Sequence, residues 1–156
     1  MIYIDVDGVL ANFEAGIRHL GFEGDLQNRV PGELEKFMAK NYDGVFRDAP
    51  PTRYLPFFKR MMTLENIGAQ NCRILTAIGS CYKAEHIDTV MENKYWWLEE
   101  HGFLRERVDI VATAADKLKY CRSGDVLYDD KQWTIDRWNK LGGIGFLVDN
   151  KNLTIT

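Results

Sequence analysis

The stretch Ile2-Tyr-Ile-Asp-Val-Asp-Gly-Val-Leu10 decides the fold class, because it sets two carboxylates directly after a short apolar run. Such a run is typical of a strand that is buried on both faces of a parallel sheet. Asp5 and Asp7 are two residues apart, so in extended backbone their side chains point the same way. Gly8 allows a sharp turn behind them because it has no Cβ. Read alone, the pair has two interpretations: a ligand site at the carboxyl end of a sheet, or an acidic turn that ends a strand.

The rest of the chain alternates short apolar runs with longer amphipathic stretches. This alternation favours an α/β fold in which helices cover both faces of a parallel sheet. The expected strands, five in all, cover residues 1–4, 73–76, 108–112, 126–128 and 145–148. The helices expected between the later strands cover residues 82–101, 114–121 and 133–141.

One interval, residues 11–71, lacks a convincing core strand and is too long for a plain loop. Its pattern predicts helices over 12–20, 32–40 and 55–68. The economical interpretation is a small helical cap inserted after the first strand, at approximately residues 15–71. We therefore expect a single domain over residues 1–156, with its core formed by 1–14 and 72–156.

The composition limits what the protein can bind. Its 156 residues suit one domain, and 46% hydrophobic with 28% charged residues is the balance of a soluble globular protein. The net charge of −3 gives no general attraction for nucleic acid or anionic membranes, so we expect neither as a partner. No apolar run approaches the ~20 residues of a membrane span, and we expect no signal peptide before the first strand. We expect a cytoplasmic protein, without zinc or disulfides, and a homodimer stays open.

The ends of two other expected strands carry polar groups that suit the same site. Thr76 ends the second strand, and the adjacent carboxylates Asp129 and Asp130 directly follow the fourth. Buried carboxylates that crowd together repel one another, so two such pairs at one sheet edge need a cation. An all-oxygen cluster suits Mg²⁺. Lys117, near the start of a helix, would add a fixed positive charge.

Together these groups predict phosphoryl transfer. Asp5 would attack a phosphate ester as a nucleophile, and an aspartyl-phosphate intermediate would divide the hydrolysis into two easier steps. Asp7 would protonate the leaving oxygen and later accept a proton from the attacking water. Mg²⁺ and Lys117 would offset the repulsion between a carboxylate and a phosphate dianion.

These groups resemble the four ordered motifs of the haloacid-dehalogenase (HAD) superfamily: Asp5-Val-Asp-Gly-Val9, Thr76, Lys117 and Asp129-Asp130. Within it the chain most resembles the 5'(3')-deoxyribonucleotidase family. The similar stretches are Asp5-Val-Asp-Gly-Val-Leu-Ala-Asn-Phe13, Lys94-Tyr-Trp-Trp-Leu-Glu-Glu-His-Gly102, Asp116-Lys117 and Gly124-Asp-Val-Leu-Tyr-Asp-Asp130. The resemblance implies a HAD-type Rossmannoid sheet, Mg²⁺ dependence and action on nucleoside monophosphates.

The resemblance also implies individual roles. Asp129 would bind the metal together with Asp5 and the carbonyl of Asp7, and Asp130 would bond to its water shell. The phosphoryl oxygens would be held by Thr76, Lys117 and the amide of Ala77. Phe13 would line the nucleoside pocket, and Phe46 is a candidate for a stacking wall in the cap.

The chain departs from the family's pattern at three positions that bear on the substrate. Ala77 and Ile78 stand where the family has Ser-Pro, and Ala115 stands where it has an Arg. Lys131 replaces a second Arg and cannot make the same planar, bidentate contact. Lys94 is a rival to Lys117 as the motif cation, but Lys117 is preferred because the motif lysine should follow the third strand.

Three functions stay open at this stage. The first is hydrolysis of (deoxy)ribonucleoside monophosphates to nucleoside and phosphate. The second keeps the chemistry and changes the substrate to another small phosphoester or a nucleic-acid terminus. The third is a HAD-fold module that binds a nucleotide or a protein without hydrolysis.

Overall fold

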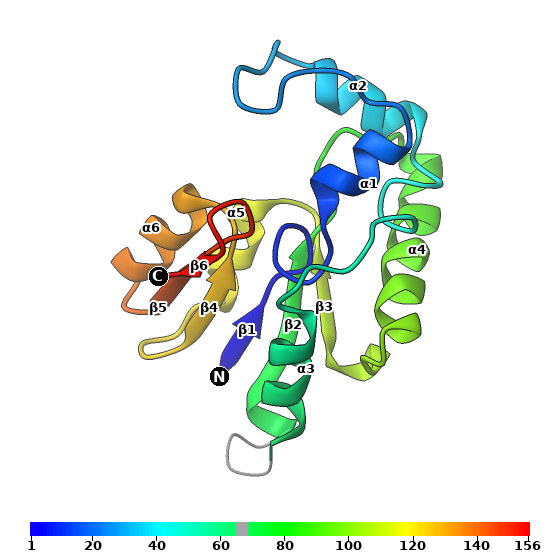
Figure 1. The fold of residues 1–156 in the computed structure, drawn as a ribbon. Coiled ribbons are helices and arrows are strands. Elements are labelled where there is room, and N and C mark those ends of the chain that lie inside the picture. The colour runs from blue at the N-terminus through cyan, green and yellow to red at the C-terminus, as the bar shows by residue number, and fades with distance from the viewer. Residues whose placement is uncertain (65–68) are drawn as a thin grey trace.

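A computed structural model describes residues 1–64 and 69–156 of the chain (Figure 1). Six strands in these residues form one sheet in the order β3-β2-β1-β4-β5-β6. Strands β1 to β5 are parallel, and β6 pairs antiparallel with β5. The strands are β1 (Ile2–Ile4), β2 (Cys72–Ala77), β3 (Val108–Val111), β4 (Val126–Asp129), β5 (Ile144–Asp149) and β6 (Thr154–Ile155). The class is therefore α/β with a mostly parallel sheet.

The expectation of five parallel strands is wrong by one strand. The chain turns back after β5, and Ile155 pairs with Val148 while Thr154 pairs with Asp149. A two-residue strand offers no alternation of apolar and polar residues, so its sequence carries no strand signal. The five strands that were expected all form, and their ends differ from the expected positions by at most one residue.

The helices agree with the sequence pattern in type and differ at their ends. They are α1 (Phe13–His19), α2 (Glu33–Lys40), α3 (Leu55–Thr63), α4 (Ile87–Glu100), α5 (Ala114–Lys117) and α6 (Gln132–Lys140). The helix expected over 55–68 ends at Thr63, and residues 65–68 lie outside the described residues. The helix expected over 114–121 continues past Lys117 only as a 3-10 turn. In the described residues, no helix has both the length and the apolar character needed to cross a membrane.

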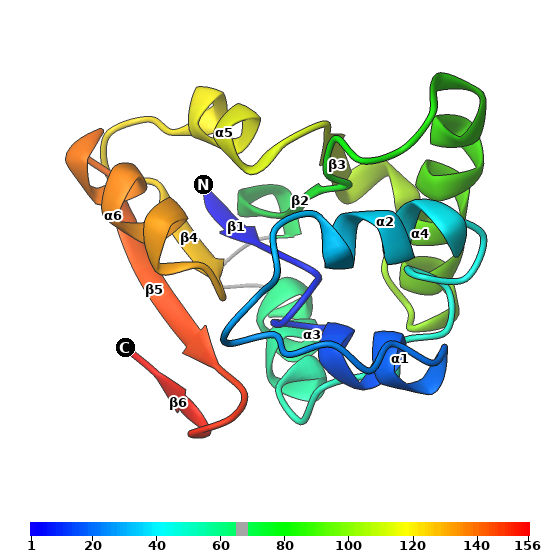
Figure 2. The ribbon, with the colours of Figure 1, turned by 90° about the horizontal axis from the view of Figure 1, so that it is seen from above.

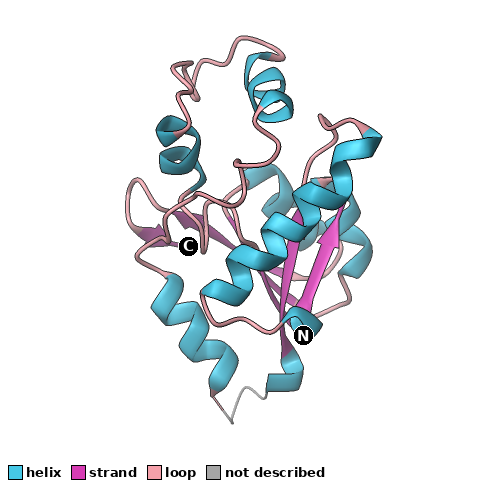
Figure 3. Cartoon of the chain, turned by 90° about the vertical axis from the view of Figure 1, so that its right-hand side faces the viewer, coloured by secondary structure: helices cyan, strands magenta, loops and turns pink. Residues whose placement is uncertain are grey.

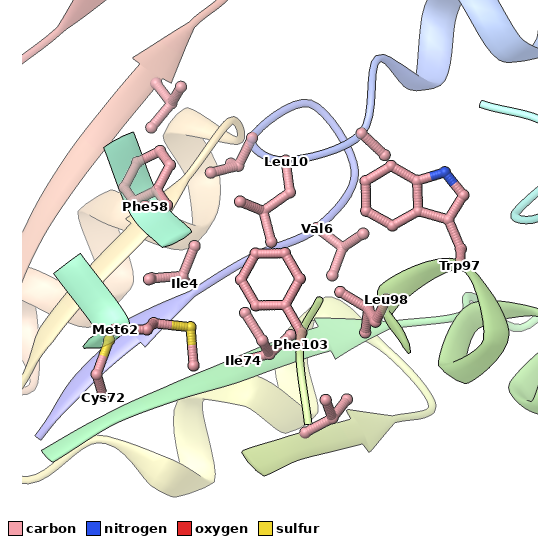
Figure 4. Close-up of a cluster of buried hydrophobic side chains, with 14 of the residues drawn as sticks. Ile4, Val6, Leu10, Phe58, Met62, Cys72, Ile74, Trp97, Leu98 and Phe103 are labelled. Atoms are coloured by element: carbon pink, nitrogen blue, oxygen red, sulfur yellow. The ribbon is translucent and has the colours of Figure 1, made fainter. Parts of the chain in front are cut away.

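Helices cover both faces of the sheet (Figure 3). On one face, side chains from α3 and α4, including Phe58 and Trp97, pack with Ile4 and Ile74 of the central strands (Figure 4). The other face is covered mainly by α6, where Trp138 packs in a cluster with Tyr3, Leu75, Leu127 and Ile135. Neighbouring residues along β1 and β2 thus point to opposite layers, as expected for strands buried on both sides.

The connection between β1 and β2 divides into two parts. Helix α3 packs directly on the sheet, where Phe58 is fully buried. Helices α1 and α2 instead lie above the carboxyl ends of the strands (Figures 1 and 2). We refer to residues 12–49 as the α1–α2 segment. Asn12 begins it by accepting a hydrogen bond from the Ala15 amide at 3.0 Å, which caps α1.

Helix α4 holds the end of the α1–α2 segment in place. The Asn93 side chain donates to the main-chain carbonyl of Asp43 at 2.9 Å, and the Trp97 indole donates to the carbonyl of Ala49 at 2.7 Å. Asn93 and Trp97 are both buried. The wall that this segment forms above the sheet is therefore fixed to the core at two points four residues apart on α4.

Candidate active site

The central position of β1 brings the two pairs of acids together. Strand β1 lies between β2 and β4, with Ile4 in register with Tyr128. The amide of Asp5 continues this pairing and donates to the carbonyl of Tyr128 at 2.9 Å. Asp5, Asp129 and Asp130 each place a carboxylate oxygen within 4.8 Å of the others. The strand order thus creates the acidic cluster that the strand ends predict.

Lys117 joins two members of this cluster. Its ammonium group lies 2.9 Å from Oδ2 of Asp5 and 2.7 Å from Oδ2 of Asp129, and all three side chains are buried. Helix α5 fixes the position of Lys117 through a capping box, in which Thr113 accepts from the Asp116 amide and the Asp116 carboxylate accepts from Thr113. Asp116, which precedes Lys117, therefore serves to cap α5.

Gly8 is required at the turn that follows the two aspartates. Its φ of +80° is left-handed, which strains residues that carry a Cβ. A Cβ on Gly8 would also lie 2.1 Å from Oδ2 of Asp130. The turn is closed by a bond from the Gly8 amide to the carbonyl of Ala11 at 2.8 Å, and the Asn150 side chain donates to the carbonyl of Gly8. Asp130 can approach this loop only because position 8 has no side chain.

A second buried ammonium group belongs to Lys94. It donates to Oδ2 of Asp7 at 2.5 Å and to the carbonyl of Ala77 at 2.8 Å, and only 1% of the residue is exposed. The same nitrogen lies 4.0 Å from the ring centroid of Phe46 in the α1–α2 segment. Lys94 and Lys117 thus both lie in the site. The preference for Lys117 as the motif cation therefore does not exclude Lys94 from it.

The surroundings move the pKa values of Asp5 and Asp7 in opposite directions. Burial by itself raises the pKa of Asp5, but the ammonium groups of Lys117 and Lys94 outweigh it, so the pKa is lowered. For Asp7, burial and the charge of Asp5 outweigh the attraction of Lys94, and the pKa is raised. Partial loss of hydration, with the charges of Asp5 and Asp129, also raises the pKa of Asp130. Asp5 is therefore held as an anion, whereas Asp7 accepts a proton more readily.

Two buried oxygen atoms in the site have no hydrogen-bond partner among the described residues: Oδ1 of Asp5 and Oγ1 of Thr76. An unpaired polar atom in the interior is costly, so each is expected to meet a ligand. The carboxylate oxygen belongs to an all-oxygen cluster, which is the donor set that Mg²⁺ prefers. The hydroxyl can donate to an anionic oxygen. The residues present therefore fit a magnesium ion and a phosphoryl group.

A cavity of about 300 Å³ opens above these groups. Seven of the site residues predicted from the sequence line this cavity: Asp5, Asp7, Phe13, Phe46, Ala77, Lys117 and Asp130. Thr76 and Asp129 are fully buried and lie outside the lining. Phe46 is only 5% exposed, so most of its ring packs against other side chains. Lys131 also lines the cavity, and its amide donates to Asp129 at 2.9 Å.

Sequence reasoning did not identify Arg29 and Glu35, which line the same cavity from the α1–α2 segment. No motif marks either residue, because their position depends on how this segment folds over the sheet. Lys94 did carry a signal. It occupies the buried stripe of α4 with Val90, Trp97 and Leu98, where a lysine is unusual unless it is paired.

The comparisons with known proteins leave the family open. No family model matches the chain, and no curated protein matches it. A hydrolase from Streptococcus pneumoniae TIGR4 is similar at 15% sequence identity and a TM-score of 0.46, over 97% of this chain and 94% of that one. The Legionella pneumophila effector Ceg4 with an N-terminal yeast Hog1p sequence is similar at 13% identity and a TM-score of 0.45, over 98% of this chain and 88% of that one.

Proposed function

We propose that the protein is a magnesium-dependent phosphatase of the HAD type that hydrolyses nucleoside monophosphates to nucleoside and phosphate. One observation carries the proposal. The Lys117 ammonium lies between Asp5 and Asp129, while the other oxygen of Asp5 is buried without a partner. Such an arrangement orients one carboxylate toward the cavity and keeps it charged.

The two central carboxylates suit the two chemical roles because their pKa values are moved apart. An oxygen of Asp5 attacks phosphorus and forms an aspartyl phosphate, while the bond from phosphorus to the leaving oxygen breaks. Asp7 gives its proton to that leaving oxygen. Asp7 then takes a proton from a water molecule, which attacks phosphorus, releases inorganic phosphate and restores the Asp5 carboxylate.

Asp5, Asp129 and the main-chain carbonyl of Asp7 would hold a Mg²⁺ ion, and Asp130 would bond to its water shell. When bound, the ion supplies positive charge that offsets the repulsion between Asp5 and a phosphate dianion. Thr76 donates its hydroxyl to a phosphoryl oxygen. The Lys117 ammonium adds a fixed cation at the same place.

The cavity supports a small leaving group. Its volume of about 300 Å³ is at the lower end of the range for small-molecule sites, which disfavours a polynucleotide. Phe13 lines it and is partly exposed, so its ring is available for stacking on a base. In this proposal the α1–α2 segment acts as the cap that encloses the substrate.

Phosphate release from a panel of nucleoside, sugar and aryl monophosphates, with and without Mg²⁺, tests the proposal. Wild-type protein should release phosphate only with the metal, and Asp5→Asn should lower the rate by at least ~10³-fold, as loss of a catalytic nucleophile does. Asp136→Asn is the matched control, because Asp136 is exposed on α6 and lies outside the cavity. Wild-type turnover by Asp5→Asn would exclude the mechanism, and no activity on any ester would exclude the function.

A further inference from the structure

The outer part of the cavity differs from its acidic floor. Apolar side chains form most of the outer wall: Phe13, Leu34, Met38, Phe46 and Ile78. The polar groups there are few, chiefly Arg29 and Glu35, with Ser80 and Cys81 from the loop after β2. A polyhydroxylated sugar needs many polar partners, because each buried hydroxyl without one is costly. A flat, largely apolar ring with a few polar groups at its edge fits this wall better.

Glu35 supplies a carboxylate at the rim. It stands on α2 in the same turn as Leu34 and Met38, which also line the cavity, and its side chain is exposed. Its charge acts on Cys81, another residue of the cavity lining, since burial and to a smaller extent the Glu35 carboxylate raise the pKa of the Cys81 thiol. In the part of the chain that the structure describes, Glu35 forms no salt bridge. An ionised carboxylate only accepts hydrogen bonds, so it selects a ligand edge that carries donors.

Arg29, from the same segment, supplies hydrogen-bond donors where Glu35 supplies acceptors. The residue lines the cavity, and its Nε donates to the carbonyl of Leu26 at 3.3 Å. Within residues 1–64 and 69–156, no carboxylate forms an ion pair with it. A guanidinium only donates hydrogen bonds, and its fork matches two acceptors that lie side by side. The rim therefore pairs an acceptor with a donor, six residues apart in the chain.

Among the nucleobases, guanine carries the complementary edges. Its N1–H and 2-amino groups are adjacent donors that one carboxylate can accept together, and its O6 and N7 are adjacent acceptors that suit a guanidinium. Adenine presents a single donor beside ring-nitrogen acceptors, and inosine lacks the 2-amino donor. We infer that this site selects guanine nucleoside monophosphates, with Glu35 accepting from N1–H and the 2-amino group and Arg29 donating to O6 and N7.

This inference rests on the proposed function for the presence of a nucleotide, but its test does not need turnover. Dissociation constants for guanosine, inosine and adenosine 5'-monophosphates are measured by calorimetry with Asp5→Asn protein and Mg²⁺. Guanosine monophosphate should bind about tenfold or more tightly than adenosine monophosphate, with inosine monophosphate between them. Glu35→Gln should reduce the guanosine-to-adenosine ratio to near one. Glu33→Gln, the same change on the same helix but outside the cavity lining, should keep the ratio.

The outcomes separate the two proposals. Equal binding of the three nucleotides, binding of none of them, or a preference that survives Glu35→Gln would overturn the guanine inference. Phosphate release by the wild-type protein would still support the phosphatase in each of these cases. A guanine preference lost in Glu35→Gln, in a protein that releases no phosphate, would support the inference and contradict the phosphatase.

Discussion

The Lys94 ammonium group lies 2.5 Å from a carboxylate oxygen of Asp7, although the two residues are 87 positions apart in the chain. Helix α4 supplies the lysine and the loop after β1 supplies the acid. The same nitrogen also donates to Ala77 at the end of β2. Lys94 therefore holds in place the carboxylate that would transfer protons in the proposed mechanism.

Lys94→Met is expected to lower kcat by about 10²-fold, because Asp7 loses the contact that orients it for acid and base catalysis. The loss should be larger for an alkyl phosphate than for an aryl phosphate, whose better leaving group needs less protonation. Kinetics with both esters measure this, and the melting temperature reports folding. Lys83→Met changes an exposed lysine just before α4 and should act as wild type. Equal losses for both esters would argue against a role through Asp7.

Gly8→Ala should destabilise the protein and reduce its activity. The left-handed backbone costs an alanine about 1–2 kcal/mol. Gly21→Ala carries the same kind of strain at φ +103° but meets no atom within 4 Å. Only the change at Gly8 displaces Asp130, so Gly8→Ala should lose more stability than Gly21→Ala in denaturant unfolding, and only Gly8→Ala should lose activity. Full activity in Gly8→Ala would contradict the close packing of Asp130 on this loop.

Thr113→Ala removes the cap of α5 and should cost about 1 kcal/mol of unfolding free energy. Because α5 carries Lys117, activity should fall as well, through a higher KM for the phosphate ester. Thr63→Ala is a suitable control, since Thr63 is exposed at the end of α3 and its hydroxyl donates to the carbonyl of Arg60, its one side-chain hydrogen bond among the described residues. Steady-state kinetics and thermal melts of both variants make the comparison. An unchanged KM in Thr113→Ala would show that the cap does not position Lys117.

Mg²⁺ should raise the melting temperature, because an ion that binds only the folded chain stabilises it by about 2.7 kcal/mol at a hundred times its dissociation constant. Asp129→Asn should lose this stabilisation, since it removes charge from the cluster that also contains Asp5 and Asp130. Asp149→Asn, at the end of β5 and outside the cluster, is the control. Thermal melts over a range of Mg²⁺ concentrations give the result. An equal shift in wild type and Asp129→Asn would place the ion elsewhere.

The floor of the site could be predicted from sequence because it depends on where buried strands end. Asp5 follows β1, and Thr76 and Asp129 lie in the last two residues of β2 and β4. In a parallel sheet those ends meet at one edge, so the apolar runs predict that the three residues lie at the same edge. Their closeness depends also on the strand order, which puts β1 between β2 and β4. The turn at Gly8 was also predictable, since a glycine after the acids permits the left-handed backbone that is found there.

The walls could not be predicted in the same way. The position of Lys94 in the buried stripe of α4 indicates that its ammonium group is paired. No residue near Lys94 in the sequence indicates that Asp7 is the partner. Arg29 and Glu35 reach the cavity because the α1–α2 segment folds over the sheet, and α4 holds the end of this segment through Asp43 and Ala49. Contacts of this kind depend on packing between distant elements, which no short motif records.

Trapping the covalent intermediate tests the central claim most directly. Wild-type protein is mixed with Mg²⁺ and a substrate that it turns over, and borohydride is added to reduce any acyl phosphate to an alcohol. Peptide mass spectrometry should then find homoserine at position 5, and only when both metal and substrate are present. Turnover without any modification at Asp5, or with modification of another carboxylate, would contradict Asp5 as the nucleophile.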